Sequence, residues 1–169
     1  MSDDISRRNF LATAGSAGLL LPLALSKNAK AQMKIKDDCV FCGFAAGKGK
    51  FFKVWEDKHF LAFLDYKPIN PGHTLLVPKE HVEYIFDLNK KSYEKIFERA
   101  RALAAPLKSA TEAKRIGMIV EGFGMAHAHV HLIPLHKGGE LLKKGATGVT
   151  DEEFSQTAAK IAAAIKRGK

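Results

Sequence analysis

Short apolar runs separated by turn-forming residues recur along the chain from residue 51 onward. Residues 51–56 and 59–65 are rich in aromatic and aliphatic side chains and are joined by a charged turn, so they predict a β-hairpin. Residues 74–78, 115–120 and 127–134 have the same strand character. The pattern therefore predicts about five strands, and the short connections between several of them favour antiparallel pairing.

Two later segments repeat their apolar residues at helical spacing. From Ser92 to Leu107 apolar residues recur every three or four positions with charges between them, which predicts an amphipathic helix that Pro106 should kink or shorten. A second stripe follows the sequence Thr150-Asp151-Glu152-Glu153, a capping box, and predicts a C-terminal helix over 151–167. The predicted fold class is α+β: a mostly antiparallel sheet of about five strands, with helices packed on one side and a C-terminal helix.

The first 31 residues have the pattern of an export signal. Residues 6–11, SRRNFL, match the twin-arginine signature, an apolar run follows, and residues 29–31 fit the small-x-small cleavage rule. We expect a twin-arginine signal peptide over 1–31, cleaved after Ala31, and a periplasmic protein without a stable membrane span after processing. An uncleaved membrane anchor is the alternative, but the apolar run is shorter than the roughly 20 residues of a spanning helix and Pro22 interrupts it.

Length and charge narrow the function classes. Residues 32–169 are enough for one domain with a hydrophobic core and too few for two. The whole chain has 27 Lys and Arg against 18 Asp and Glu, a net charge of +9, which favours anionic partners such as nucleotides. The basic residues are spread along the chain and no nucleic-acid-binding module is visible, so nucleic acid is not an expected partner.

Three histidines at alternate positions mark residues 127–131 as the candidate site. In an extended strand the side chains at i, i+2 and i+4 share one face, so His127, His129 and His131 would point one way and Ala128 and Val130 into a core. Near neutral pH an imidazole can act as a nucleophile, acid, base or metal ligand. A catalytic site and a shared metal ion are both open interpretations.

The chain has two cysteines, Cys39 and Cys42, separated by two residues. Such a pair can be half of a zinc site, a disulfide or a redox pair. An oxidising periplasm keeps the disulfide open as an interpretation. No thioredoxin-like βαβ pattern surrounds the pair, which makes the redox interpretation the weakest.

The three alternating histidines, followed by Leu132 and Ile133, resemble the signature of the histidine triad (HIT) family. A Gly-His pair at residues 72–73, an apolar strand and Pro78-Lys79 resemble a second motif of that family. The resemblance covers roughly residues 38–135 and implies a HIT domain over 32–169. Its members bind nucleotides, so it implies an enzyme that cleaves a nucleoside monophosphate from a phosphoanhydride, a phosphoramidate or a related ester. It does not specify the base or the leaving group.

The resemblance also implies a role for each histidine. His129 is the expected nucleophile on the α-phosphorus, and His131 and His73 are expected to orient it and stabilise charge on the phosphoryl oxygens. His127 stands on the leaving-group side or ligates zinc. Asp65, which ends the predicted strand 59–65, resembles the aspartate that holds the ribose, although an Asp that caps the following turn is the alternative.

Further expectations concern the rest of the site and the assembly. Phe63, Leu64 and Ile69 should wall the base pocket, and Gly124 should let backbone amides approach a phosphate. By the same resemblance a structural zinc ion and a homodimer are expected, the dimer formed with the helix that begins near Ser92. The expected zinc ligands are Cys39, Cys42, His81 and His127.

The chain departs from the family pattern at two positions. Many members carry an Asn at the end of the strand before the triad and a Gln four residues before its first histidine, whereas this chain has Val120 and Phe123 near those places. Two other function classes therefore stand beside the enzyme. One is a nucleotide-binding protein without turnover, and the other is a periplasmic zinc- or copper-binding protein that uses the histidine cluster.

Overall fold

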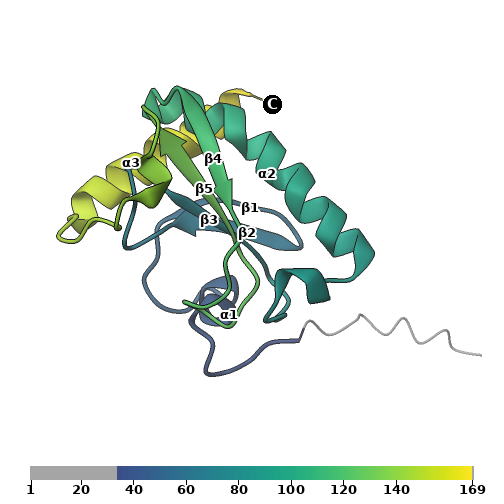
Figure 1. Cartoon of the computed structure of the whole chain (residues 1–169). Helices are drawn as coiled ribbons and strands as arrows, with labels where there is room; N and C mark the ends of the chain where they lie inside the picture. Colours follow the sequence, from purple (N-terminus) through teal and green to yellow (C-terminus); the bar gives the residue numbers. More distant parts are fainter. Residues whose placement is uncertain (1–33, 169) are drawn as a thin grey trace, which may run out of the picture. The chain divides into compact units, whose positions relative to one another are not determined.

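Figure 1 shows a computed structural model of the chain, which describes residues 34–168. The signal peptide and cleavage site expected over residues 1–31 lie outside the described residues. A five-stranded sheet in the order β1-β2-β3-β5-β4 forms the centre of the domain, and every neighbouring pair is antiparallel. The strands are β1 (Lys53–Glu56), β2 (Phe60–Leu64), β3 (Thr74–Pro78), β4 (Arg115–Ile119) and β5 (Val130–Leu135). The predicted α+β fold and its five strands are confirmed.

Within residues 34–168, three α-helices and two short 3-10 turns surround the sheet. They are α1 (Val40–Ala45), η1 (Ile85–Asp87), α2 (Lys90–Thr111), η2 (Glu140–Leu142) and α3 (Asp151–Arg167). The helices α2 and α3 pack on one face of the sheet, whereas α1 packs on the other. Among residues 34–168 there is no helix with the length and apolar character needed to cross a membrane.

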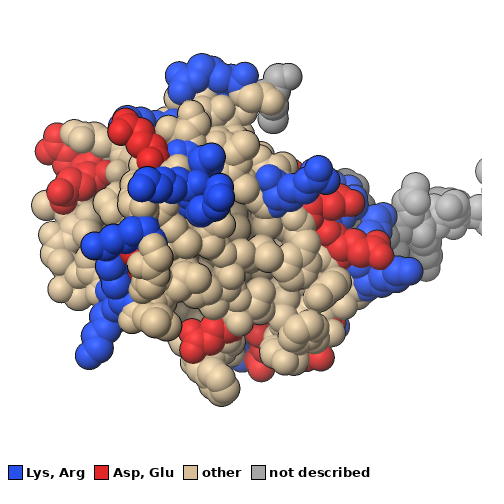
Figure 2. Space-filling model, turned by 45° about the horizontal axis from the view of Figure 1, so that its top comes forward, with Lys and Arg blue, Asp and Glu red and all other residues tan. Residues whose placement is uncertain are grey.

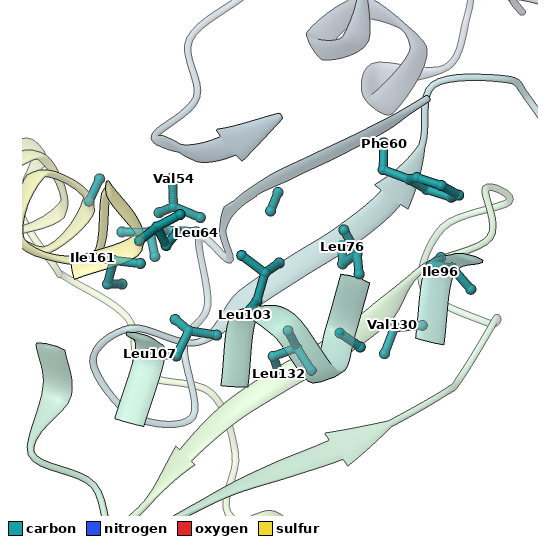
Figure 3. Close-up of a cluster of buried hydrophobic side chains, with 14 of the residues drawn as sticks. Val54, Phe60, Leu64, Leu76, Ile96, Leu103, Leu107, Val130, Leu132 and Ile161 are labelled. Carbon is teal, nitrogen blue, oxygen red and sulfur yellow. The ribbon is translucent and has the colours of Figure 1, made fainter. Parts of the chain in front are cut away.

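Strand β2 shows how the sheet separates two cores. All five of its residues are buried, because both faces of the strand are covered. Phe60, Ala62 and Leu64 point toward α2 and α3, while Leu61 and Phe63 point toward α1. Figure 3 shows the helix-side core, in which strand and helix side chains interdigitate.

The two long helices test two predictions. Thr150 accepts from the Glu153 amide while the Glu153 side chain accepts from the Thr150 amide, so the predicted capping box is confirmed. The expected shortening at Pro106 is wrong, because α2 continues to Thr111. Leu103 and Leu107 on either side of the proline are buried against the sheet, and this packing holds the last turns in place.

Gly72 fixes the entrance to β3. It has φ 88, and a Cβ there would lie 2.5 Å from Cγ2 of Thr111 at the end of α2. Only glycine combines that backbone conformation with that contact. The Gly72-His73 pair is therefore set by packing of the loop before β3 against α2, and this packing fixes where His73 begins the strand.

Charged side chains are distributed over the surface rather than gathered in one stripe. On the face in Figure 2, Lys and Arg form several separate groups with acidic side chains between some of them. Part of this pattern comes from local ion pairs, such as Lys79 with Glu56 at 2.8 Å and Arg99 with Asp57 at 2.8 Å.

Candidate functional site

The alternating histidines lie on the α1 side of the sheet, together with His73. Strand β5 begins only at Val130, so His127 and His129 precede it, yet the alternation extends back to them. The ring centroids of His129 and His131 are 4.9 Å apart, and those of His131 and His73 are 5.1 Å apart. Ala128, Val130 and Leu132 point into the helix-side core, as expected.

Hydrogen bonds fix the proton positions on His73 and His131. The Ile69 amide donates to Nδ1 of His73 at 3.2 Å, so the proton of a neutral His73 sits on Nε2. That nitrogen lies 2.9 Å from Nδ1 of His131, which must then accept. The remaining proton of His131 is on its Nε2, which is left as a donor for a ligand.

His129 is the opposite tautomer to His73 and His131. Its Nδ1 lies 2.6 Å from the backbone oxygen of His127, and a carbonyl oxygen can only accept, so Nδ1 carries the proton. Nε2 therefore bears the lone pair, and it makes no hydrogen bond to any residue between 34 and 168. An imidazole held as this tautomer, with a free Nε2 lone pair, is suited to nucleophilic attack.

Burial keeps the histidine relay, the hydrogen-bonded rings of His73 and His131, in its neutral form. It lowers the pKa of His73 to about 4, where Asp65 opposes and His131 assists the shift. Burial also lowers the pKa of His131, and the neighbouring His129 adds to that effect. Both rings are therefore neutral at pH 7, as the donor and acceptor assignments require.

Asp65 combines a turn-capping contact with an oxygen that faces the histidines. Its Oδ1 accepts from the Lys67 amide at 2.8 Å. Its Oδ2 lies 3.6 Å from Nδ1 of His73 and 3.9 Å from Nδ1 of His131. The carboxylate, with its side chain 21% exposed, thus lies at the edge of the site with one oxygen outside the turn.

The residues expected to wall the base pocket do not lie together. Phe63 is on the histidine side, but Leu64 is the next residue on β2 and points into the opposite core. Leu64 and Ile69 line a cavity of about 270 Å³ against α3, behind His73. Gly124 lies in an exposed turn, and no heavy atom lies within 4 Å of the place where its Cβ would be.

Three aromatic residues on the histidine side were missed by sequence reasoning. Phe41 lies edge-on to His129 with centroids 5.7 Å apart and to Phe63 at 5.2 Å. Phe44 stacks on Phe51 at 4.8 Å and lies edge-on to Phe63 at 5.2 Å. The signal available was the i, i+3 spacing of Phe41 and Phe44, but α1 has only six residues, too few for a helical period to stand out.

A second cluster lies next to the triad and is made of the two cysteines and two histidines. Sγ of Cys39 is 3.4 Å from Nδ1 of His127, and Sγ of Cys42 is 3.3 Å from Nδ1 of His81. All four donor atoms lie within 4.8 Å of one another, and both cysteines are free thiols. A tetrahedral zinc ion with Zn–S of about 2.3 Å and Zn–N of about 2.0 Å would separate S and N by about 3.5 Å, so the donor set fits zinc.

His127 is oriented toward the cysteines. Its Nε2 donates to the Pro78 oxygen at 2.9 Å, which leaves the lone pair on Nδ1 facing Cys39 and Cys42. The ring is fully buried, and burial lowers its pKa to about 4, which keeps it neutral. Of the two positions expected for His127, the geometry therefore matches the zinc cluster and leaves no ring nitrogen for a leaving group.

Comparison with known proteins identifies the family. A family model described as the HIT domain matches residues 48–138. "Protein hit" of Bacillus subtilis is 30% identical over 113 residues, which cover 64% of this chain and 78% of that protein. The HIT-like protein MJ0866 of Methanocaldococcus jannaschii is 34% identical over 118 residues, 63% of this chain and 87% of the relative.

Solved structures share the fold. A HIT-like protein from Bartonella henselae, with a title that mentions cell-cycle regulation, has 25% identity and a TM-score of 0.67 over 76% of this chain and 98% of its own. A Zn-bound histidine triad family protein from Mycobacterium smegmatis has 22% identity and a TM-score of 0.67 over 77% and 94%, which shows the fold alone. Because the matched domain spans more than half of the chain and includes all three alternating histidines, the chain belongs to the HIT domain family.

Proposed function

We propose that this protein is a nucleotide-binding HIT hydrolase or transferase that acts through a nucleotidyl-His129 intermediate. The observation that carries the proposal is the hydrogen bond from Nδ1 of His129 to the His127 oxygen, because it leaves the Nε2 lone pair free. Membership of the HIT family and a similar structure described as a histidine triad nucleotide-binding protein from Sulfolobus tokodaii (25% identity, TM-score 0.69, 76% of this chain and 93% of that one) also support it.

In the proposed first step, Nε2 of His129 forms a bond to the α-phosphorus of the nucleotide. The bond from phosphorus to the leaving group breaks, and the leaving group departs with the electron pair. The Nε2 proton of His131 is available to a phosphoryl oxygen, and His73 fixes that proton through its own hydrogen bond to Nδ1 of His131. A water oxygen then forms a bond to the phosphorus and gives up a proton to solvent, while the bond from phosphorus to Nε2 breaks and its electron pair returns to Nε2, which releases the nucleoside monophosphate and restores His129.

Substrate recognition uses the groups around this line of histidines. We assign the ribose hydroxyls to Oδ2 of Asp65, which makes no hydrogen bond to residues 34–168. We assign the base to the α1 side of the sheet beside Phe51, whose partly exposed ring packs against the buried Phe44 and Phe63 and offers apolar contact and stacking. Neither assignment selects among the four bases.

Turnover of an adenosine phosphoramidate by the full chain tests the proposal. Replacing His129 by Ala should lower kcat by a factor on the order of 10³ or more, because the nucleophile is removed. Replacing the exposed His59 by Ala is the matched control and should leave the rate unchanged. Mass spectrometry of protein quenched in base during turnover should find the nucleotidyl adduct on His129. Equal rates for the wild type and His129→Ala would contradict the mechanism.

A nucleotide-binding protein without turnover is the second candidate. The observation in its favour is that Val120 and Phe123, exposed apolar residues, stand near the places where many family members carry phosphate-binding amides. Binding of AMP by the wild type, with no hydrolysis of phosphoramidates or dinucleoside polyphosphates, would favour this candidate over the enzyme.

We also propose that Cys39, Cys42, His81 and His127 bind one structural zinc ion. Support comes from the donor distances, in which Nδ1 of His81 faces Sγ of Cys42 and Nδ1 of His127 faces Sγ of Cys39. Such an ion would link α1 to the end of β3 and to the segment before β5. Metal analysis of the full chain should give one zinc per chain, and the variant Cys42→Ser should lose it. A wild type without zinc, in which Cys39 and Cys42 are oxidised, would favour the disulfide interpretation instead.

We propose a homodimer that involves α2, as the resemblance implies, together with the open edge of the sheet beside it. Strand β4 is an edge strand, and exposed apolar side chains lie on it and next to it, including Met118 at 51%, Phe86 at 65% and Phe123 at 98%. Pairing of this edge with a second copy would cover them. Light scattering of the full chain should give twice the monomer mass, and Met118→Lys should lower it. A monomer at high concentration would contradict the proposal.

Export is proposed from residues 6–11 alone. Replacing Arg7 and Arg8 together by Lys should retain the protein in the cytoplasm, because the twin-arginine pathway reads this pair. Cell fractionation of the wild type and the double variant provides the measurement, and equal distribution of the two would contradict it.

A further inference from the structure

The segment after the triad returns to the loop that carries Asp65. Between η2 and α3, the Ala146 amide donates to the Pro68 oxygen at 2.8 Å. At Gly145 a Cβ would lie 2.2 Å from the Lys67 oxygen and 2.9 Å from its carbonyl carbon. The φ of Gly145 is not in the left-handed region, so only the lack of space requires a glycine there.

Helix α3 also contacts this loop at Tyr66, the residue before Lys67. The ring of Tyr66 lies edge-on to Phe154 of α3, with centroids 5.8 Å apart, and to Phe52 at 6.0 Å. Its hydroxyl donates to the Lys50 backbone oxygen, and the Lys50 side chain pairs with Asp151 at the start of α3. Residues 66–68 are therefore held in part by residues 145–154, which follow the triad in sequence.

This loop sets the geometry on both sides of the site. The Lys67 amide donates to Oδ1 of Asp65 at 2.8 Å and orients the carboxylate. The Ile69 amide donates to Nδ1 of His73 at 3.2 Å and so decides the tautomer of the relay. Ile69 borders the cavity of about 270 Å³ rather than packed side chains. The position of the loop therefore depends more on the contacts that Lys67 and Pro68 make with residues 145–146.

We propose that Gly145 and Ala146 are positioning residues that hold the Asp65 carboxylate in place for the ribose hydroxyls. The inference rests on the proposed function, because it takes Asp65 as the ribose-binding group. The post-triad segment would then determine selection for ribose rather than for the leaving group. A Cβ at 145 requires the Lys67 carbonyl to move by about 0.8 Å to reach even a 3.0 Å contact. Because the Lys67 amide orients the Asp65 carboxylate, a displacement of this size would disturb that hydrogen bond.

The test compares binding of AMP and 2′,3′-dideoxy-AMP to the full chain by calorimetry. The wild type should prefer AMP by about 10-fold or more, since hydrogen bonds from two hydroxyls to a carboxylate are lost in the analogue. Asp65→Asn should reduce that preference, and Gly145→Ala should reduce it to a similar degree. The control is Gly138→Ala, on the other side of η2, where a Cβ meets no atom within 4 Å, and it should keep the wild-type preference.

A second variant keeps the inference testable if Gly145→Ala does not fold. Ala146→Pro removes the amide that donates to Pro68 at an exposed position outside any helix or strand, and it should weaken the preference in the same direction. A wild-type preference retained in the folded positioning variants would overturn the inference and leave the proposed function intact. A wild type that binds AMP without any preference would overturn the role of Asp65 and this inference with it, whereas a wild type that binds no nucleotide would overturn the proposed function as well.

Discussion

The buried His73 should make the stability of the protein depend on pH in a way that one substitution removes. Burial lowers the pKa of His73 from 6.5 to about 4 in the folded chain. Between those values the unfolded chain binds a proton at this position and the folded chain does not, so stability falls as the pH falls. At pH 4.5, two pH units below the unfolded pKa, the loss due to His73 is about 2.5 kcal/mol, since each unit is worth about 1.4 kcal/mol.

Urea unfolding of the wild type and of His73→Gln at pH 7.5 and pH 4.5 measures this contribution of His73 to the free energy of unfolding. At pH 7.5 the wild type should be the more stable of the two, because the variant loses the hydrogen bonds of the relay. At pH 4.5 the gap between them should be smaller by about 2.5 kcal/mol, since Gln does not titrate. Carboxylates and histidines that do not contact residue 73 are present in both proteins, so their contributions cancel in the difference. A gap that is the same at both pH values would refute the reasoning, and His59→Gln serves as a matched histidine replacement at an exposed position.

Three further predictions concern single groups. Leu132→Ala removes a side chain that is 2% exposed in the helix-side core, and urea unfolding should show a loss of about 2–5 kcal/mol; a loss below about 1 kcal/mol would contradict the assigned packing. Thr150→Ala breaks the capping box of α3 and should cost about 1 kcal/mol, whereas Gln156→Ala on the same helix should change little. Removal of zinc with a chelator should lower the melting temperature of the wild type and leave that of Cys42→Ser unchanged; an equal effect on both would argue against a metal held by Cys42.

The fold was accessible from sequence because the strands carry clear apolar patterns. The β1–β2 hairpin was expected and is present, and the antiparallel pairing of β4 with β5 agrees with the pairing expected across short connections. The boundaries were less accurate at the triad, where the strand begins at Val130 although the side-chain alternation reaches His127. Pro106 was expected to kink or shorten α2, but the helix continues to Thr111, because burial of its neighbours outweighed the local preference for an earlier end.

From the sequence, the site could be predicted only as a set of residue types, without the orientation of their side chains. Alternation on β2 already implies that Phe63 and Leu64 face opposite ways, so the joint assignment to one pocket overlooked a rule that the sequence contains. Other features depend on partners distant in the chain. The tautomer of His73 depends on the Ile69 amide, and the orientation of His127 depends on the Pro78 oxygen. The contact of Gly145 with Lys67 has no local signature at all.

The division of the sheet into two faces implies that neighbouring positions of the chain are under different kinds of constraint. Around the triad, a substitution at Val130 disturbs the scaffold, whereas one at His129 or His131 changes the chemistry and leaves the opposite core untouched. A scan of every substitution across residues 128–132 should therefore alternate, residue by residue, between loss of soluble protein and loss of activity in protein that still accumulates. Such a sheet can acquire new reactivity on one side while the other side preserves the architecture.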